Sequence, residues 1–186
     1  ETECSRSLAF YDEVERTPLI AACQNRHLEV VRQLLLAGAE VNAHNEARIG
    51  ETALGELMWR GADTGMPLDE THLAIARLLL DAGADPKIAT ETKASTIMAA
   101  TGLNHGIGES LVTEADALAA VKLLLDLGVD PKGETTFGEN ALFGPAYRGW
   151  NKLLAQMIDL GVNVNAVSKA GVTPWLAASG QGDRLG

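Results

Sequence analysis

Aromatic side chains are scarce in this sequence of 186 residues, of which they make up 4%. Three Trp, two Tyr and three Phe are too few to fill one large aromatic core. Other apolar residues still raise the hydrophobic fraction to 46%. This composition favours a single elongated stack of short helices, each packed on its neighbours, over one bulky core.

Long apolar runs and basic charge are also lacking. No run approaches the ~20 residues that a membrane-spanning helix needs. The 15 Lys and Arg residues are outnumbered by 25 Asp and Glu, which gives a net charge of −10. Because an acidic surface repels phosphate groups, we expect neither nucleic acid nor an anionic membrane as a partner.

Cysteine occurs only twice, as Cys4 and Cys23. Cys23 follows two alanines on a predicted helix, so a buried free thiol is the leading interpretation. A Cys4–Cys23 disulfide is the alternative and would indicate an oxidising compartment. No signal peptide is visible, and a start at Glu1 fits a mature protein or an excised fragment. The cytoplasm and a bacterial periplasm or exterior therefore both stay open.

Catalytic signatures are missing as well. The sequence has no nucleophile–base–acid set, and its clustered glycines (Gly102, Gly106 and Gly108) follow a predicted helix instead of forming a phosphate loop after a strand. His72 and His105 lie near carboxylates, as metal ligands would. Their spacing does not support a metal site, and we expect no metal and no cofactor.

A repeated phrase dominates the rest of the chain. It reads Ala-Val-Lys-Leu-Leu-Leu-Asp-Leu-Gly-Val-Asp-Pro at 120–131, and variants of it surround three other glycines. Each copy has the pattern of an amphipathic helix that a glycine ends. The marker glycines are Gly38, Gly83, Gly128 and Gly161.

A second phrase, Thr-Pro-Leu-x-x-Ala-Ala in its fullest form, precedes each marker glycine. Thr, Ser or Asn before Pro or a small residue predicts an N-cap and a first helical turn. Each unit is therefore helix, turn, helix, glycine stop and polar connection. The phrase begins at Thr17, Thr52, Ser95, Asn140 and Thr173, and the last copy has no second half.

The spacing from cap to marker glycine identifies two inserts. It is 21 residues in the first unit (38 − 17) and the fourth (161 − 140), but 31 in the second (83 − 52) and 33 in the third (128 − 95). The inserts fall at 62–71 and 105–116, between the two helices of their units. We expect them to project from the edge opposite the connections. The outer helices of the first two units are predicted over 28–36 and about 72–80.

Together these phrases resemble the ankyrin repeat. The resemblance covers about residues 16–186, as four whole repeats and an incomplete fifth. It implies an all-α, ankyrin-like helix-turn-helix solenoid with short hairpin fingers. Residues 1–15 do not match and are expected to form an N-terminal cap or extension. The inserts and the run 147–150 are also similar to ankyrin proteins of environmental bacteria.

Two places depart from the repeat pattern. Pro145 and its neighbour Gly144 fall inside a predicted inner helix, where Pro removes a hydrogen bond and predicts a bend. Glu56 stands four residues before Arg60, which predicts an ion pair at the rim of the helix or a carboxylate offered to a ligand.

The resemblance implies a module that binds a protein partner, without catalysis, on its concave face and finger tips. Tyr, Trp and Arg commonly anchor interfaces, and aligning the caps gathers such residues near the fingers. Packing of Trp59 and Tyr147 between repeats is the alternative. The expected partner-binding residues are His44, Glu46, Arg48, Trp59, Arg60, Lys93, Thr136, Phe137, Tyr147, Arg148 and Lys169.

Two other functions stay open. An enzyme or a small-molecule or metal-binding protein would have its site between inserts 62–71 and 105–116, because function concentrates in long loops. A ligand-sized pocket lined by both inserts would favour that function. A structural spacer within a longer chain is the third possibility.

Overall fold

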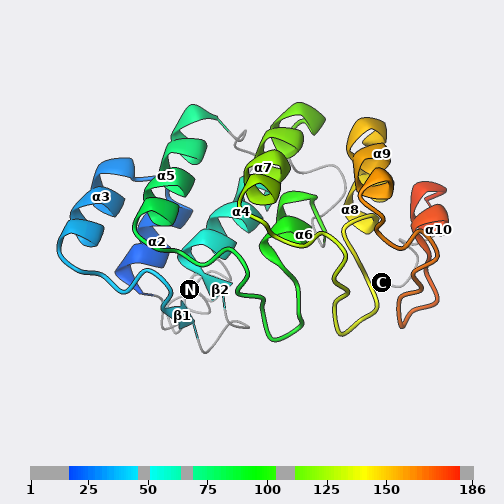
Figure 1. Cartoon of the computed structure of the whole chain (residues 1–186), viewed down its shortest axis with the longest axis horizontal. Coiled ribbons are helices and arrows are strands. Elements are labelled where there is room, and N and C mark those ends of the chain that lie inside the picture. The colour runs from blue at the N-terminus through cyan, green and yellow to red at the C-terminus, as the bar shows by residue number, and fades with distance from the viewer. Residues whose placement is uncertain (1–16, 46–50, 64–68, 104–111, 181–186) are drawn as a thin grey trace, which may run out of the picture.

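The computed structural model describes residues 17–45, 51–63, 69–103 and 112–180, with side chains described throughout these ranges except at 44–45, 51 and 59–63. Its helices stand in two rows along an elongated molecule, and short fingers project from one edge (Figure 1). The all-α solenoid with hairpin fingers that the sequence predicts is confirmed.

The two rows alternate along the chain. The inner row consists of α2 (Pro18–Gln24), α4 (Ala53–Asp63), α6 (Thr96–Ala100), α8 (Phe143–Arg148) and α10 (Pro174–Ala178). The outer row consists of α3 (Leu28–Leu36), α5 (Glu70–Asp81), α7 (Glu114–Asp126) and α9 (Asn151–Asp159). The first finger contains β1 (His44–Asn45) and β2 (Glu51–Thr52), an antiparallel pair that places His44 opposite Thr52.

Polar caps start the helices where the sequence predicts. The side-chain oxygens of Thr17, Ser95 and Thr173 each accept a hydrogen bond from the backbone N–H three residues later, at 3.2–3.4 Å. Thr113 and Asp116 form a reciprocal capping box at the start of α7. The predicted bounds of α3 are confirmed.

Helix α5 is longer than the predicted 72–80, because Asp69 caps it. Its Oδ1 accepts a hydrogen bond from the N–H of His72 at 2.9 Å. At the other end of the first insert, α4 continues to Asp63. Four of the ten residues assigned to that insert, 62–63 and 70–71, are therefore helical.

Glycine ends each outer helix, as predicted. The marker glycines lie two residues after the last helical residue, in the left-handed region that other residues rarely adopt. Their φ angles are +83° at Gly38, +92° at Gly83, +77° at Gly128 and +80° at Gly161.

The core follows the inner row. The equivalent residues Leu19, Leu54, Ile97 and Leu142 are all 0–2% exposed, since α2 packs on α4, α4 on α6 and α8 on α10. Trp175 occupies the same place in α10 and is 73% exposed. Burial in this solenoid therefore depends on having a neighbour on each side.

The bend predicted at Pro145 is wrong, because α8 begins later than its sequence suggests. The side chain of Asn140 accepts a hydrogen bond from Leu142 N–H at 3.0 Å and donates one to the carbonyl of Asn163 at 2.8 Å. Helix α8 then starts at Phe143. Pro145 is its third residue, where a backbone N–H would have no intrahelical acceptor to lose.

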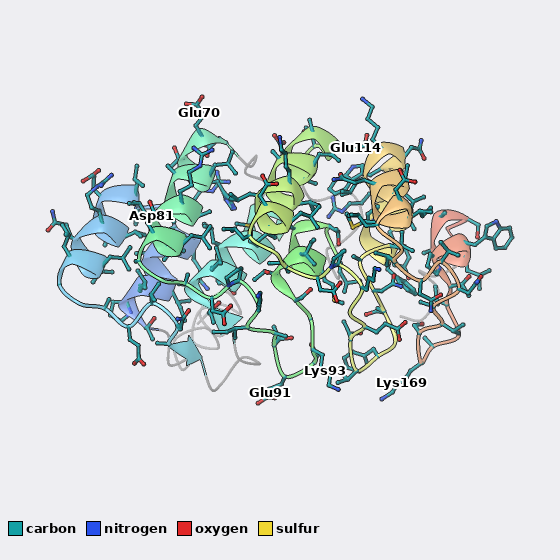
Figure 2. The ribbon with its side chains drawn as sticks, viewed as in Figure 1. Glu70, Asp81, Glu91, Lys93, Glu114 and Lys169 are labelled. Carbon is teal, nitrogen blue, oxygen red and sulfur yellow. The ribbon has the colours of Figure 1, made fainter. Side chains whose placement is uncertain are left out.

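The fingers and the roots of the inserts lie on opposite edges. Figure 2 shows Glu70 and Glu114, the first residues of α5 and α7, at one edge, and Glu91, Lys93 and Lys169 at the other. The inserts themselves fall largely outside the described residues, as does the expected cap at 1–15. Within the described ranges, no helix is long and apolar enough to cross a membrane.

Candidate functional site

The last three fingers are built alike. Each is closed by a backbone hydrogen bond: Thr90 N–H to Ala94, Thr135 N–H to Glu139, and Ser168 N–H to Val172, at 2.7–3.0 Å. In each finger the hydroxyl at the first of these positions also accepts a hydrogen bond from the backbone four residues later. The side chains between these anchors are thereby held at the tips.

Backbone hydrogen bonds also join one tip to the next. Thr136 N–H donates to the carbonyl of Thr92 at 2.7 Å, and Lys169 N–H donates to the carbonyl of Phe137 at 2.8 Å. The three fingers therefore form one continuous surface. Lys93 lies on it with a positive φ of +61° and an exposed side chain.

Phe137 and Lys169 make the clearest side-chain pair on this surface. The ring of Phe137 is 49% exposed, and the Lys169 Nζ lies 5.8 Å from its centre, within range of a cation–π interaction. An open groove of about 560 Å³ runs beside them, lined also by Glu139, Ser168 and Ala170. Partial burial raises the pKa of the Glu139 carboxyl above its ordinary value.

Tyr147 and Arg148 lie on α8 and are partly buried. The guanidinium carbon of Arg148 stacks 4.9 Å from the centre of the Trp150 ring. Its Nε and Nη2 are buried and have no hydrogen-bond partner within the described part of the chain, and burial lowers its pKa. Much of this side chain is thus held between the third and fourth repeats.

The other expected binding residues cannot be placed as side chains. His44 belongs to β1, and Trp59 and Arg60 to the last part of α4, where only the backbone is described. Glu46 and Arg48 lie outside the described residues. The structure brings together Lys93, Thr136, Phe137 and Lys169 on the fingers, and Tyr147 and Arg148 on α8.

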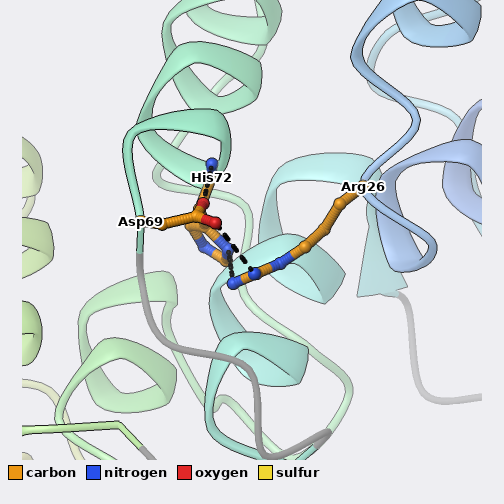
Figure 3. Close-up of polar contacts among 3 residues, drawn as sticks. All are labelled: Arg26, Asp69 and His72. Carbon is orange, nitrogen blue, oxygen red and sulfur yellow. Dashed lines mark hydrogen bonds and ion pairs between the residues drawn. The ribbon is translucent and has the colours of Figure 1, made fainter.

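A polar network that sequence reasoning missed lies at the root of the first insert (Figure 3). Arg26 reaches from the turn before α3, with its Nη2 3.2 Å from His72 Nδ1 and its Nη1 3.6 Å from Asp69 Oδ2. Because arginine can only donate, Nδ1 must accept, which assigns the ring proton to Nε2. That Nε2 is buried and finds no hydrogen-bond partner among the described residues.

This environment strongly disfavours a charged His72. Its side chain is 0% exposed, and burial, followed by the charge of Arg26, lowers its pKa from 6.5 to about 4, against the opposing effect of Asp69. A helix cap at Asp69 could have been recognised from the sequence. The contact of Arg26 with His72 could not have been recognised in this way. Arg26 has a positive φ of +54° and stands 46 residues from His72, so no short stretch of sequence indicates the contact.

The rim position expected for Glu56 is wrong. Stacking of α4 on α2 covers Glu56, which is 2% exposed, and its Oε1 accepts a hydrogen bond from Gln24 Nε2 at 2.6 Å. Cys23 on α2 is a buried free thiol whose pKa burial raises to about 12. Both groups therefore belong to the inter-repeat packing.

The alternative site, for a metal or small molecule between the inserts 62–71 and 105–116, has little support from the described side chains next to it. His72 already uses Nδ1 for Arg26 and is closed to solvent. Among the residues that the structure describes, no three His, Cys, Asp or Glu side chains are grouped so as to hold a metal ion.

Comparison with known proteins agrees with the architecture. The family model of the ankyrin repeat matches residues 15–46, which contain α2, α3 and the start of the first finger. No curated protein matches the chain. The matched pair α2–α3 is followed by three more helix pairs, α4–α5, α6–α7 and α8–α9. Each pair contacts the preceding pair through its inner helix, its outer helix or both. The chain therefore contains an ankyrin repeat, and the helix pairs that follow it have the same arrangement.

Proposed function

We propose that this protein binds a protein partner on its concave face and finger tips, without catalysing a reaction. Ankyrin repeats imply a protein-interaction module, and one observation supports the choice of the fingers. Three fingers joined tip to tip present a half-exposed Phe137 beside Lys169 and an open groove.

The rigidity of the tips favours binding. Ordering loops and side chains on association costs free energy, and a surface that is already ordered avoids part of this cost. The hydrogen bonds from Thr136 to Thr92 and from Lys169 to Phe137 fix the tips before any partner arrives. The partner then gains the burial of the Phe137 ring.

The chemistry of the groove selects the kind of side chain that it accepts. Phe137 offers an apolar face, and Lys169 offers a cation that is exposed at the tip. A partner with an apolar side chain next to a carboxylate would satisfy both. Nucleic acid is a poorer candidate, because the chain carries a net charge of −10.

The remaining expected residues extend the proposed surface. His44 belongs to β1, Trp59 and Arg60 to the end of α4, and Tyr147 and Arg148 to α8. In the sequence, Glu46 and Arg48 stand between β1 and β2. We assign His44, Glu46 and Arg48 to the finger tips of the same interface and the residues of α4 and α8 to its concave part. Phe137 and Lys169 form its anchor.

The test uses a partner captured with the immobilised chain and then titrated against purified variants. Phe137→Ala should weaken binding by about 2 kcal/mol, or about 30-fold in Kd, as anchoring aromatic residues do. The melting temperature should change little, because the ring is half exposed.

The matched control is Ile158→Ala, which removes an apolar side chain that is 44% exposed on α9, outside the fingers. It should bind as the wild type does. Equal affinity of the wild type and Phe137→Ala would contradict the assignment of the fingers, and equal losses in both variants would indicate a nonspecific apolar contact.

A further inference from the structure

A second surface lies on the outer row, where α3 and α5 stand side by side (Figure 1). Two open hollows follow the seam between these helices. One, of about 630 Å³, lies between Leu28 on α3 and the first two turns of α5. The other, of about 320 Å³, is lined by Arg32, Leu35, Leu36, Leu78, Asp81 and Ala82.

Leu36 is the unusual residue of this seam. It is 77% exposed, more than any other large apolar side chain in the described ranges. It stands two places before the marker glycine, and the same place in the next three repeats holds Asp81, Asp126 and Asp159, all exposed. A single exposed leucine is ordinary, but this one forms part of the lining of an apolar hollow.

The charges of the seam are balanced, unlike those of the chain. Arg32 and Arg77 oppose Glu70 and Asp81, so the two hollows carry a net charge of 0 (2 − 2), against −10 for the whole protein. Two copies of an acidic protein repel each other over most of their surface. Around the hollows that repulsion is reduced, and one pair of opposite charges spans the seam: Arg32 on α3 lines the same hollow as Asp81 on α5. Arg32 also pairs with Glu29 of its own helix, Nε to Oε1 at 3.5 Å.

We propose that the α3–α5 seam binds the same seam of a second copy, as an isologous dimer. In such an interface the same patch serves both copies, so it must be complementary to itself. A two-fold axis along the seam lays α3 of each copy over α5 of the other. It brings Leu36 over the partner's Ala82, and Arg32 opposite the partner's Asp81, twice each.

The dimer leaves the binding surface free. The fingers project from a different side of the molecule than the outer helices do (Figure 1). Two copies joined through their outer rows would present two finger surfaces. A partner that carries two binding sites would then bind both surfaces with a gain in avidity. The inference does not rest on the proposed function, since the seam and the fingers share no residue.

The α3–α5 seam is short, and its length limits the expected affinity of the dimer. Helix α5 has 12 residues, or roughly 18 Å at 1.5 Å per residue. An interface of this length falls at the small end of specific interfaces. We therefore expect a monomer–dimer equilibrium that depends on protein concentration.

Analytical ultracentrifugation over a concentration series tests the proposal. Leu36→Asp introduces the residue that the other three repeats carry, so the fold should tolerate it, which a thermal melt checks. It should raise the dimer dissociation constant by roughly tenfold or more. Ile158→Asp, the matched control on α9, and Phe137→Ala on the fingers should both dimerise as the wild type does.

A charge reversal tests the geometry. Arg32→Asp and Asp81→Arg should each weaken the dimer, and the double variant should restore it, because the cross-copy pair is re-formed with opposite polarity. A wild type that stays monomeric at every concentration would overturn the proposal. So would dimerisation unaffected by Leu36→Asp, or growth beyond the dimer, which would indicate end-to-end stacking instead.

Discussion

Among the glycines in the described part of the chain, Gly144 has the least room for a side chain. A Cβ built there would overlap the carbonyl oxygen of Thr101 and lie 2.7 Å from the carbonyl carbon of Gly102 and 2.8 Å from the nitrogen of Leu103. All three are backbone atoms at the end of α6, which cannot rotate away. The glycine therefore lets the fourth repeat approach the third closely.

We expect Gly144→Ala to destabilise the protein by roughly 1–3 kcal/mol, because the third and fourth repeats must move apart. Helix propensity alone predicts the opposite sign, a gain of up to about 1 kcal/mol. Urea unfolding followed by circular dichroism measures the difference.

Gly55→Ala on α4 is the matched control for Gly144. Its nearest contact would be a side-chain atom, Thr52 Oγ1, at 3.3 Å. A change within about 1 kcal/mol is expected, because a side chain can adjust. If both variants gain stability, the close approach at Gly144 is not a constraint.

His72 makes stability depend on pH. Its folded pKa of about 4 lies below the ordinary 6.5, so the unfolded chain binds a proton that the folded chain excludes. The stabilisation is complete above pH 6.5 and declines as pH falls toward about 4. A shift of this size is worth on the order of 3 kcal/mol in unfolding free energy.

Denaturation at a series of pH values across this window measures the effect. His72→Gln should flatten the decline, because the titrating group is gone. The control variant His27→Gln replaces an exposed histidine before α3. Its stability should decline with falling pH as that of the wild type does. Identical slopes in the wild type and His72→Gln would mean that other groups, such as carboxylates, cause the loss.

At the scale of elements, one outer helix caps the next. The residue before α9, Trp150, provides no side-chain cap. Instead the Oε1 of Glu114, the first residue of α7, accepts hydrogen bonds from Lys152 N–H at 2.6 Å and Leu153 N–H at 3.1 Å. The carboxylate also carries negative charge to the positive end of the α9 dipole.

Glu114→Ala should therefore lower the unfolding free energy by about 1–2 kcal/mol, as lost N-caps do. Glu70→Ala is the control, since Glu70 is likewise the first residue of its helix and is exposed. It should cost no more than the few tenths of a kcal/mol of a helix-dipole interaction. Equal losses in the two variants would show that the contact with α9 contributes nothing.

At the scale of the whole molecule, stability should fall toward the ends. A repeat contacts only its neighbours, so a terminal repeat has fewer of them. Trp175 of α10 is 73% exposed, whereas the equivalent residue of α6, Ile97, is 0% exposed. Among the described helices, those at the centre are therefore packed on both sides, and α10 is packed on one.

Hydrogen exchange measures this gradient directly. The amides of α3 and α10 should exchange fastest, and those of α4, α6 and α7 slowest, because local opening is cheapest where contacts are fewest. Equal protection from α3 to α10 would contradict the gradient and indicate that the solenoid opens only as a whole.

Local interactions explain what the sequence determined by itself. A cap hydroxyl, a glycine stop and apolar spacing act within one helix, so the all-α repeat and the bounds of α3 follow from residues near one another in the chain. The same reasoning predicts that Phe137 and Lys169 lie on fingers. It does not predict that they meet, because they are 32 residues apart (169 − 137).

The tertiary structure decided the contacts between repeats. Asn140 delays the start of α8 by bonding to the next repeat at Asn163, stacking buries Glu56, and Arg26 reaches His72 across one repeat boundary. Each depends on how far one helix pair is rotated and shifted against the next. That rotation is set by packing over the whole interface, and no short stretch of sequence encodes it.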